Sequence, residues 1–303
     1  MRRLAVLGIV LGLVAAGVAP ALAAAPRYPV PYTFAAGIAA AAIENGAPPP
    51  GANNWKCKPS AAHPRPVVLV HGLAATMTDN WQTISPLLAD NGYCVFALTY
   101  GEEPGETSFG GLEPMEQSAA VLATFVNKVL AATGATKVDI VGHSEGATMP
   151  DYYVKFLGGA RKVDHYVGIS SVLKGTTFYG LSAFAAEDPS AASSLTSGVC
   201  QSCTEFLTGS PFIDKLDAGG PAVPGVTYTL IATEHDELVV PYTNGLVTAP
   251  NVTDIVVQNQ CPLDASDHLA IVADPVTGQD VLNALDPAHR HRVPCTLVAP
   301  VVG

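Results

Sequence analysis

The sequence predicts a single α/β domain with a mostly parallel central sheet flanked by helices. Short apolar runs alternate along the chain with longer stretches whose apolar residues recur at helical spacing. The apolar runs, such as 66–73, are continuous, as in strands that are covered on both faces of a parallel sheet. Near the middle, over 138–158, such a run leads through a glycine-containing turn into a helix-compatible segment.

The composition limits the function before any motif is considered. The chain has 303 residues, and 26 acidic against 15 basic side chains give a formal net charge of −11. This balance argues against binding to nucleic acid and against strong attraction to anionic lipid surfaces, so we expect an uncharged substrate. The hydrophobic content of 49% is that of a globular chain, and we expect one domain that acts as a monomer.

The N-terminus has the parts of a secretory signal: a basic start, an apolar run over 4–19 and a small-residue cleavage site ending at Ala23. We therefore expect a signal peptide over 1–23 and a secreted domain over 24–303. A membrane anchor is the alternative, but the run is short, is broken by Pro20 and is followed by no basic cluster.

The six cysteines of this chain favour three disulfides, because bridges persist in the oxidising compartments that exported proteins enter. Several pairings are open in principle, and we favour those between sequence neighbours. These are Cys57 with Cys94, Cys200 with Cys203, and Cys261 with Cys295. The closely spaced pair Cys200 and Cys203 is alternatively a redox or metal motif, but no thioredoxin-like context surrounds it and no second pair supplies ligands.

The first part of the domain establishes the alternation of strands and helices. Residues 24–66 are rich in Ala, Pro, Gly and Asn and form an N-terminal wrap with a short helix near 35–43. The apolar run 66–73 is the first strand. A helical pattern over 80–90 and a second strand over 93–98 follow it.

The middle of the chain continues in the same order. The loop 99–113 is glycine-rich and acidic and should border the site. The helix 114–133 has apolar residues at i, i+3, i+4, i+7 and i+8, and Gly134 ends it, so one face packs on the sheet. Strands are predicted at 138–141 and 163–169.

The region 171–225 has no clear periodicity and is rich in Gly, Ser, Thr, Ala and Pro, with scattered aromatic residues. Because so long a loop in a compact domain is usually functional, we interpret it as a cap-like wall that binds an acyl chain. An ordinary packed connection is the alternative. The strand 226–232 then delivers the polar segment 233–241, and the last strand, 251–258, leads to His268.

The turn Gly142-His143-Ser144-Glu145-Gly146 has the pattern of a nucleophile elbow, in which a serine sits between a strand and a helix. The turn is so tight that only small residues fit two positions before and after the serine, and Gly142 and Gly146 meet this need. The helix N-terminus behind Ser144 favours developing negative charge. We therefore predict that Ser144 is a nucleophile.

A serine needs a base within hydrogen-bond reach and a carboxylate that orients this base. Asp236 and His268 each follow a predicted strand, which places both at the edge of the sheet where Ser144 lies. We predict His268 as the base and Asp236 as the acid. The competing residues are His235 for the base, and Glu234 and Glu237 for the acid.

Acyl transfer also needs N–H groups that stabilise an oxyanion. The strand 66–70 ends in a His71-Gly72 turn, and we expect the backbone N–H of Leu73 to be one donor. The N–H of Glu145, directly after the nucleophile, would be the second. A plain exit from the strand into a loop is the alternative for residues 71–73.

At these residues the sequence resembles the secreted bacterial lipase class 2 family of the α/β-hydrolase fold, over most of residues 53–295. The matching stretches are 68–72, 92–96, 138–146, 231–241 and 261–271. The resemblance implies triacylglycerol lipase or carboxylesterase activity and no cofactor. We expect a small-molecule or lipid ester as the substrate and transient contact with a lipid–water interface. The resemblance also implies the triad Ser144, Asp236 and His268.

Other functions stay open with the same residues. An acyltransferase or a polyester hydrolase would use the same triad, and a hydrolase-fold binding protein would use none of it. No metal is expected, because the candidate oxygen ligands, Asp264 and Asp267, lack the number and spacing that Ca²⁺ requires.

Glu145 departs from the family pattern, in which Met or Gln is common at this position. A carboxylate beside an oxyanion hole would oppose the charge that the hole stabilises. We expect its charge to raise the pKa of His268 and to move the activity optimum to alkaline pH, unless the side chain faces solvent or makes a satisfied contact.

Overall fold

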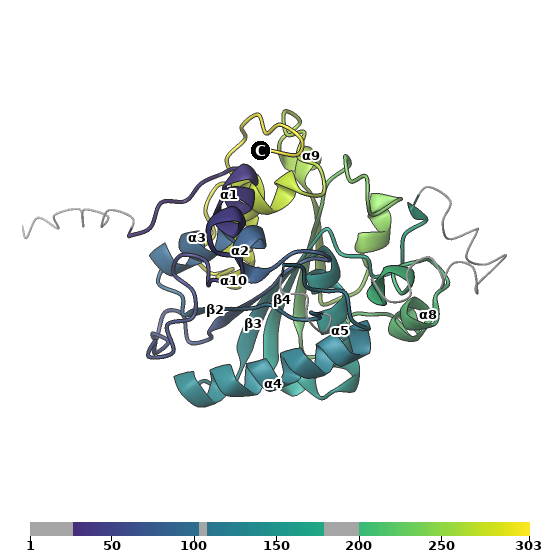
Figure 1. Ribbon diagram of the computed structural model, residues 1–303, viewed down its shortest axis with the longest axis horizontal. Helices are drawn as coiled ribbons and strands as arrows, with labels where there is room; N and C mark the ends of the chain where they lie inside the picture. The colour runs from purple at the N-terminus through teal and green to yellow at the C-terminus, as the bar shows by residue number, and fades with distance from the viewer. Residues whose placement is uncertain (1–26, 103–107, 179–199) are drawn as a thin grey trace, which may run out of the picture.

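The computed structural model describes residues 27–102, 108–178 and 200–303 (Figure 1). Six strands form one sheet: β1 Val67–Val70, β2 Val95–Leu98, β3 Val138–His143, β4 Val163–Ile169, β5 Thr227–Ala232 and β6 Val252–Val256. Their order is β2-β1-β3-β4-β5-β6, and all neighbours pair in parallel. All six strands expected from the apolar runs are confirmed.

The burial of the strands explains their sequences. Every residue of β1, β2 and β3 is buried, which agrees with continuous apolar runs rather than alternation. The edge strand β6 has no buried residue, and Thr253 and Asp254 are exposed on it. The predicted site residues Leu73, Ser144 and Asp236 follow the largely buried strands β1, β3 and β5, whereas His268 follows the edge strand β6.

Helices cover both faces of the sheet (Figure 1). Their bounds are α1 Ala35–Glu44, α2 Met77–Asn80, α3 Ile84–Asp90, α4 Met115–Thr133, α5 Met149–Phe156, α8 Pro211–Asp217, α9 Val257–Gln260 and α10 Pro275–Leu285. One core lies between the sheet and α4, α5 and α8. The other lies between the sheet and α3 and α10.

Two predicted elements differ from the structure. The helix expected over 80–90 is two helices, because a capping box at Thr76 starts α2 early and the fully buried Trp81 leaves the helical conformation. The strand expected over 251–258 ends at Val256, where α9 begins.

Helices α8 and α10 were not predicted from hydrophobic periodicity, but their first residues carry helix-start signals. Each begins with proline, and the preceding Ser210 or Asp274 caps it by accepting hydrogen bonds from backbone N–H groups of its first turn.

The three predicted disulfides are confirmed, with Cα–Cα distances of 5.8 Å for Cys57–Cys94, 5.5 Å for Cys200–Cys203 and 5.0 Å for Cys261–Cys295. The expected signal peptide lies outside the described residues, as does the centre of the region 171–225. In the part of the chain that is described, no helix combines the length and the apolar character that a membrane span needs.

Candidate active site

Ser144 lies at the end of β3, at the start of the short 3₁₀ turn Ser144–Ala147. Its φ of 54° is in the left-handed region, which is strained for a residue with a side chain. A Cβ atom at Gly142 would lie 1.7 Å from the carbonyl oxygen of Gly146, and one at Gly146 would lie 2.0 Å from that of Val70. The glycines therefore allow the elbow that the sequence predicts.

The structure brings the three predicted triad residues together. The Oγ of Ser144 is 2.8 Å from the Nε2 of His268, and both carboxyl oxygens of Asp236 are 2.9 Å from the Nδ1 of this ring. Burial favours a higher pKa for Asp236, but the His268 ring and the hydrogen bonds to the carboxylate outweigh it, so that its pKa is lowered. Asp236 is therefore ionised and can orient the ring.

The competing residues have other positions. Glu237 accepts a hydrogen bond from the backbone N–H of His268 at 3.2 Å and is bonded to no ring nitrogen of that residue. The side chains of Glu234 and His235 are exposed. The geometry therefore favours Asp236 over Glu234 and Glu237 as the partner of the base.

The loop after β1 places a free N–H beside the serine. The N–H of Gly72 donates to the Oδ1 of Asn80 at 2.9 Å, and that of Ala74 donates to the carbonyl oxygen of Gly110 at 2.9 Å. Between them, the N–H of Leu73 has no acceptor among the described residues, and neither does that of Glu145. Both predicted oxyanion donors are thus available.

Two buried histidines contact backbone groups of the loops around the site. Burial lowers the pKa of His71 to about 4 and that of His143 to about 3, so both rings are neutral. The Nδ1 of His71 lies 2.8 Å from the carbonyl oxygen of Gly72, and its Nε2 accepts from the N–H of Tyr100. The Nε2 of His143 lies 2.9 Å from the carbonyl oxygen of His268.

Asn80 is a site residue that the sequence did not reveal. Its Oδ1 accepts from the N–H of Gly72 at 2.9 Å and lies 3.1 Å from the Nδ1 of His143, so Asn80 stands between the oxyanion loop and the elbow strand. It belongs to the short helix α2, and no local pattern distinguishes it from an ordinary helix-end asparagine.

The side chain of Glu145 is fully buried, and the described structure gives it no ion pair. Burial raises its pKa well above the ordinary value of a glutamate. The burial and the raised pKa contradict the expected negative charge of Glu145 beside the oxyanion hole. A buried carboxyl group without a cation keeps its proton.

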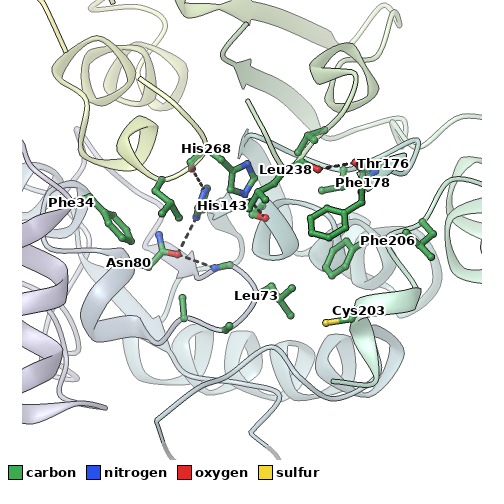
Figure 2. A pocket seen from close by; sticks show the side chains of 18 residues that line it. Phe34, Leu73, Asn80, His143, Thr176, Phe178, Cys203, Phe206, Leu238 and His268 are labelled. Atoms are coloured by element: carbon green, nitrogen blue, oxygen red, sulfur yellow. Dashed lines mark hydrogen bonds between the residues drawn. The ribbon is translucent and has the colours of Figure 1, made fainter. Parts of the chain in front are cut away.

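A pocket of about 440 Å³ opens over Ser144. Figure 2 shows Phe34 on one side of His268, and Phe178 and Phe206 on the other. Leu73 and Leu238 add to an almost wholly apolar wall. The described ends of the region 171–225 thus line this pocket, and Phe34 comes from the N-terminal wrap.

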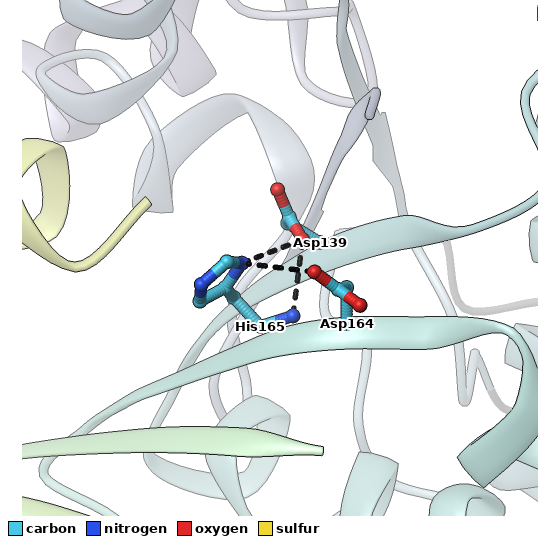
Figure 3. A group of neighbouring side chains, drawn as sticks. All are labelled: Asp139, Asp164 and His165. Atoms are coloured by element: carbon cyan, nitrogen blue, oxygen red, sulfur yellow. Dashed lines mark hydrogen bonds and ion pairs between the residues drawn. The ribbon is translucent and has the colours of Figure 1, made fainter. Parts of the chain in front are cut away.

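A group that could hold a metal, Asp139, Asp164 and His165, lies at the amino ends of β3 and β4, whereas Ser144 follows the carboxyl end of β3. Figure 3 shows this group. Asp139 and Asp164 are the second residues of β3 and β4, beside His165. The guanidinium of Arg65 lies 2.8 Å from Asp139 and 3.3 Å from Asp164, and Lys137 lies 2.8 Å from Asp164. Two side-chain cations thus balance the two carboxylates, and the cluster is best described as an ion-pair network.

Comparison with solved structures identifies the fold. Aspergillus fumigatus lipase B superimposes with a TM-score of 0.61 at 19% identity, over 82% of this chain and 57% of that chain. The mature form of the Bacillus licheniformis lipase BlEst2 gives a TM-score of 0.55 at 16% identity, over 79% and 96%. The predicted α/β-hydrolase fold is confirmed.

Sequence comparison identifies the family. Triacylglycerol lipases of Pseudarthrobacter phenanthrenivorans and Burkholderia plantarii are each 40% identical to this chain over 97 residues, or 30% of it. The match covers 28% and 25% of these relatives, about a quarter of their length. The family model described as lipase (class 2) matches residues 64–280, most of the domain around Ser144. The chain belongs to the class 2 lipase family.

Proposed function

We propose that this protein hydrolyses carboxylic esters through an acyl-enzyme, with Ser144 as nucleophile, His268 as base and Asp236 as the acid that orients it. The observation that carries the proposal is the continuous contact from Asp236 through His268 to Ser144, with distances of 2.9 Å and 2.8 Å. Family membership supports the same reaction.

In the first half of the reaction, the Nε2 of His268 takes the proton of the Ser144 hydroxyl as Oγ bonds to the ester carbonyl carbon. The negative charge moves to the carbonyl oxygen, where the N–H groups of Leu73 and Glu145 stabilise it. His268 then gives the proton to the departing alkoxide, and the C–O bond to the alcohol breaks.

In the second half, a water molecule replaces the alcohol. His268 removes a proton from this water as it attacks the acyl carbon, and then returns the proton to the Oγ of Ser144 when the acid leaves. Asp236 stays ionised throughout, since its role is to hold the ring and stabilise the imidazolium.

The pocket supports an uncharged, apolar ester as substrate. Its volume of about 440 Å³ is within the usual range of small-molecule sites, and aromatic side chains of its lining lie on both sides of His268 (Figure 2). One side would take the acyl chain and the other the alcohol. The net charge of −11 favours neutral acylglycerols or simple esters over anionic substrates.

We also propose that the protein works outside the cytoplasm, as a monomer that contacts a lipid–water interface transiently. Three disulfides are typical of proteins that meet an oxidising compartment. Terminal sequencing of protein from a culture supernatant would test the expected start at or near Ala24.

The test of the function combines labelling and turnover. A fluorophosphonate should modify the wild-type protein and leave Ser144→Ala unlabelled, and that variant should lose ester hydrolysis while it keeps its far-UV circular dichroism. A series of p-nitrophenyl esters and emulsified triglyceride would distinguish esterase from lipase. Labelling without hydrolysis of any ester would favour an acyltransferase, and no labelling would favour a silent binding protein.

A further inference from the structure

The carboxyl group of Glu145 lies behind the oxyanion hole, beside hydroxyl groups that do not donate to it in this structure. Its side chain is fully buried, and neither carboxyl oxygen accepts a hydrogen bond from the described residues. The hydroxyl groups of Tyr100 and Ser202 face it. A buried carboxylate in this position would be costly, because a charge removed from water needs a cation or several donors.

Both facing hydroxyls already use their protons elsewhere. The Tyr100 hydroxyl donates to the carbonyl oxygen of His71 at 2.9 Å, and the Ser202 hydroxyl donates to that of Gly111 at 2.6 Å. Each hydroxyl has one proton, so while it makes these bonds it can only accept from Glu145. A hydroxyl turned toward Glu145 would lower the pKa of this carboxyl group, but burial raises that pKa more. A protonated carboxyl group can donate to either of them, and an ionised one can donate to neither.

The two carbonyl groups that receive these protons belong to the framework of the oxyanion hole. His71 precedes Gly72 and Leu73 in the turn after β1. A Cβ atom at Gly111 would lie 3.1 Å from the Oε2 of Glu145 and 3.2 Å from the Cα of Leu73, so Gly111 lies close to both and leaves no room for a side chain between them. Any shift of Gly111 therefore acts directly on Leu73.

We propose that Glu145 is a positioning residue whose protonated side chain, together with Tyr100 and Ser202, holds the Leu73 N–H in the oxyanion hole, and that its ionisation releases this loop. The proposal rests on the proposed acyl-transfer function for its catalytic consequence. When Glu145 loses its proton, the hydroxyls of Tyr100 and Ser202 turn toward the new charge. They then abandon the carbonyl groups of His71 and Gly111.

Other titratable groups near Glu145 set where this change occurs. Tyr100 is fully buried after β2, and burial and Glu145 together raise its pKa well above 10, so it stays protonated. His71 stacks on the Tyr100 ring and is neutral. Burial raises the pKa of Glu205 to about 7, with Glu116 adding to this, and the charge of Glu205 further raises the pKa of Glu145. No described cation counteracts these effects at Glu145.

The direction of the pH effect follows. Because burial raises the pKa of Glu145 well above its ordinary value, the loop is intact at neutral pH and is released at alkaline pH. Loss of one oxyanion donor lowers kcat by about 10²-fold or more. KM should change little, since the donor acts mainly on the transition state.

The first experiment compares pH profiles of kcat from about pH 5 to about pH 10 for wild type, Glu145→Gln and Glu234→Gln. The side-chain amide in Glu145→Gln still donates to the facing hydroxyls but cannot ionise, so the ratio of alkaline to neutral kcat within this variant should exceed the wild-type ratio. Glu234→Gln, a matched change at an exposed site, should follow the wild-type profile. Alkaline limbs that coincide for wild type and Glu145→Gln would overturn the proposal.

A second variant tests the direction of the coupling. Glu205→Gln removes a negative charge that raises the pKa of Glu145, so the alkaline limb should move to lower pH. A limb that moves to higher pH or stays in place would contradict the assignment of this limb to Glu145.

A third measurement reads the proton without turnover. The infrared difference spectrum between wild type and Glu145→Gln at neutral pH should contain the carbonyl stretch of a protonated carboxylic acid. Its absence would overturn the proposal even if the enzyme is active. Wild-type protein that hydrolyses no ester would instead refute the proposed function, while the infrared band would still report the state of Glu145.

Discussion

Two carboxyl groups lie beside Ser144, and they have nearly the same burial but opposite ionisation. Asp236, in the loop after β5, is 9% exposed, while Glu145, in the turn after β3, is 0% exposed. Asp236 faces the ring of His268 and accepts hydrogen bonds from the N–H groups of Leu238 and Val239. Glu145 faces two hydroxyls whose protons are engaged elsewhere.

The difference shows that burial alone does not decide the charge of an acid. Burial favours a higher pKa for both groups, but only Asp236 has partners that outweigh it, so its pKa is lowered while that of Glu145 is raised. Of the two acids near the proposed nucleophile, Asp236 is therefore charged beside the proposed base, and Glu145 is neutral beside the proposed oxyanion hole.

The largest expected effect is on the charged member of the pair. Asp236→Asn should lower kcat by about 10⁴-fold, because an amide in place of the carboxylate favours the wrong tautomer of His268. Stopped-flow acylation with a p-nitrophenyl ester would measure the loss. If the rate falls by less than tenfold, Asp236 is not the orienting acid, and the comparison with Glu145 has no catalytic meaning.

The next effect tests the contact between Glu145 and the oxyanion loop. Gly111→Ala would place a methyl group against both the Glu145 carboxyl and Leu73, at a φ of 72°, and should lower kcat by about 10 to 10²-fold. Gly134→Ala is the matched control, since φ there is 79° and no atom lies within 4 Å of the added methyl. It should cost about 1–2 kcal/mol of stability and leave kcat unchanged. Equal loss of kcat in both variants would mean that general destabilisation is the cause.

Stability should report the opposite ionisation directly. Above the unfolded pKa of about 4.3, the folded wild-type protein keeps a proton on Glu145 that the unfolded chain has lost. The contribution of Glu145 to the free energy of unfolding therefore falls by about 1.4 kcal/mol per pH unit, until the pH reaches the folded pKa. Glu145→Gln removes this slope. Asp236 has a lowered pKa in the folded protein, so it stabilises the fold at pH values above the ordinary pKa of an aspartate. This stabilisation is lost as the pH falls through the folded pKa. Urea unfolding of wild type and Glu145→Gln at several pH values would measure the difference, and a gap that is constant with pH would show that Glu145 is ionised in the fold.

The smallest effect concerns Glu237, the third acid of the site. Glu237→Gln weakens a hydrogen bond to the backbone N–H of His268 and leaves the ring contacts intact, so kcat should fall less than about tenfold. The measurement is the same acylation assay as for Asp236→Asn. A loss as large as that of Asp236→Asn would reverse the roles of the two acids.

The sequence predicts the six strands, the elbow and the meeting of Ser144, Asp236 and His268, because these depend on local patterns. Continuous apolar runs define parallel strands, and residues that follow such strands share one edge of the sheet. The same reasoning gave Leu73 and Glu145 as N–H donors, which the structure leaves available.

The environment of the Glu145 side chain could not be predicted, because it depends on contacts distant in sequence. Tyr100 follows β2 and Ser202 lies far along the chain beside a disulfide, so no window around the elbow contains both. The support that Asn80 gives to Gly72 has the same origin. Local patterns show which residues reach the site, while the tertiary contacts decide their charge.

The last residues of the chain bridge two walls of the pocket. The N–H of Val301 donates to Asp267, the residue before His268, and the carbonyl oxygen of Val302 accepts from the N–H of Phe34. An affinity tag fused after Gly303, or a deletion of the final residues, would therefore act on both the base and the aromatic wall. For production of this protein, a tag at the expected domain start near Ala24 is the safer design, and activities measured with a C-terminal fusion should be checked after its removal.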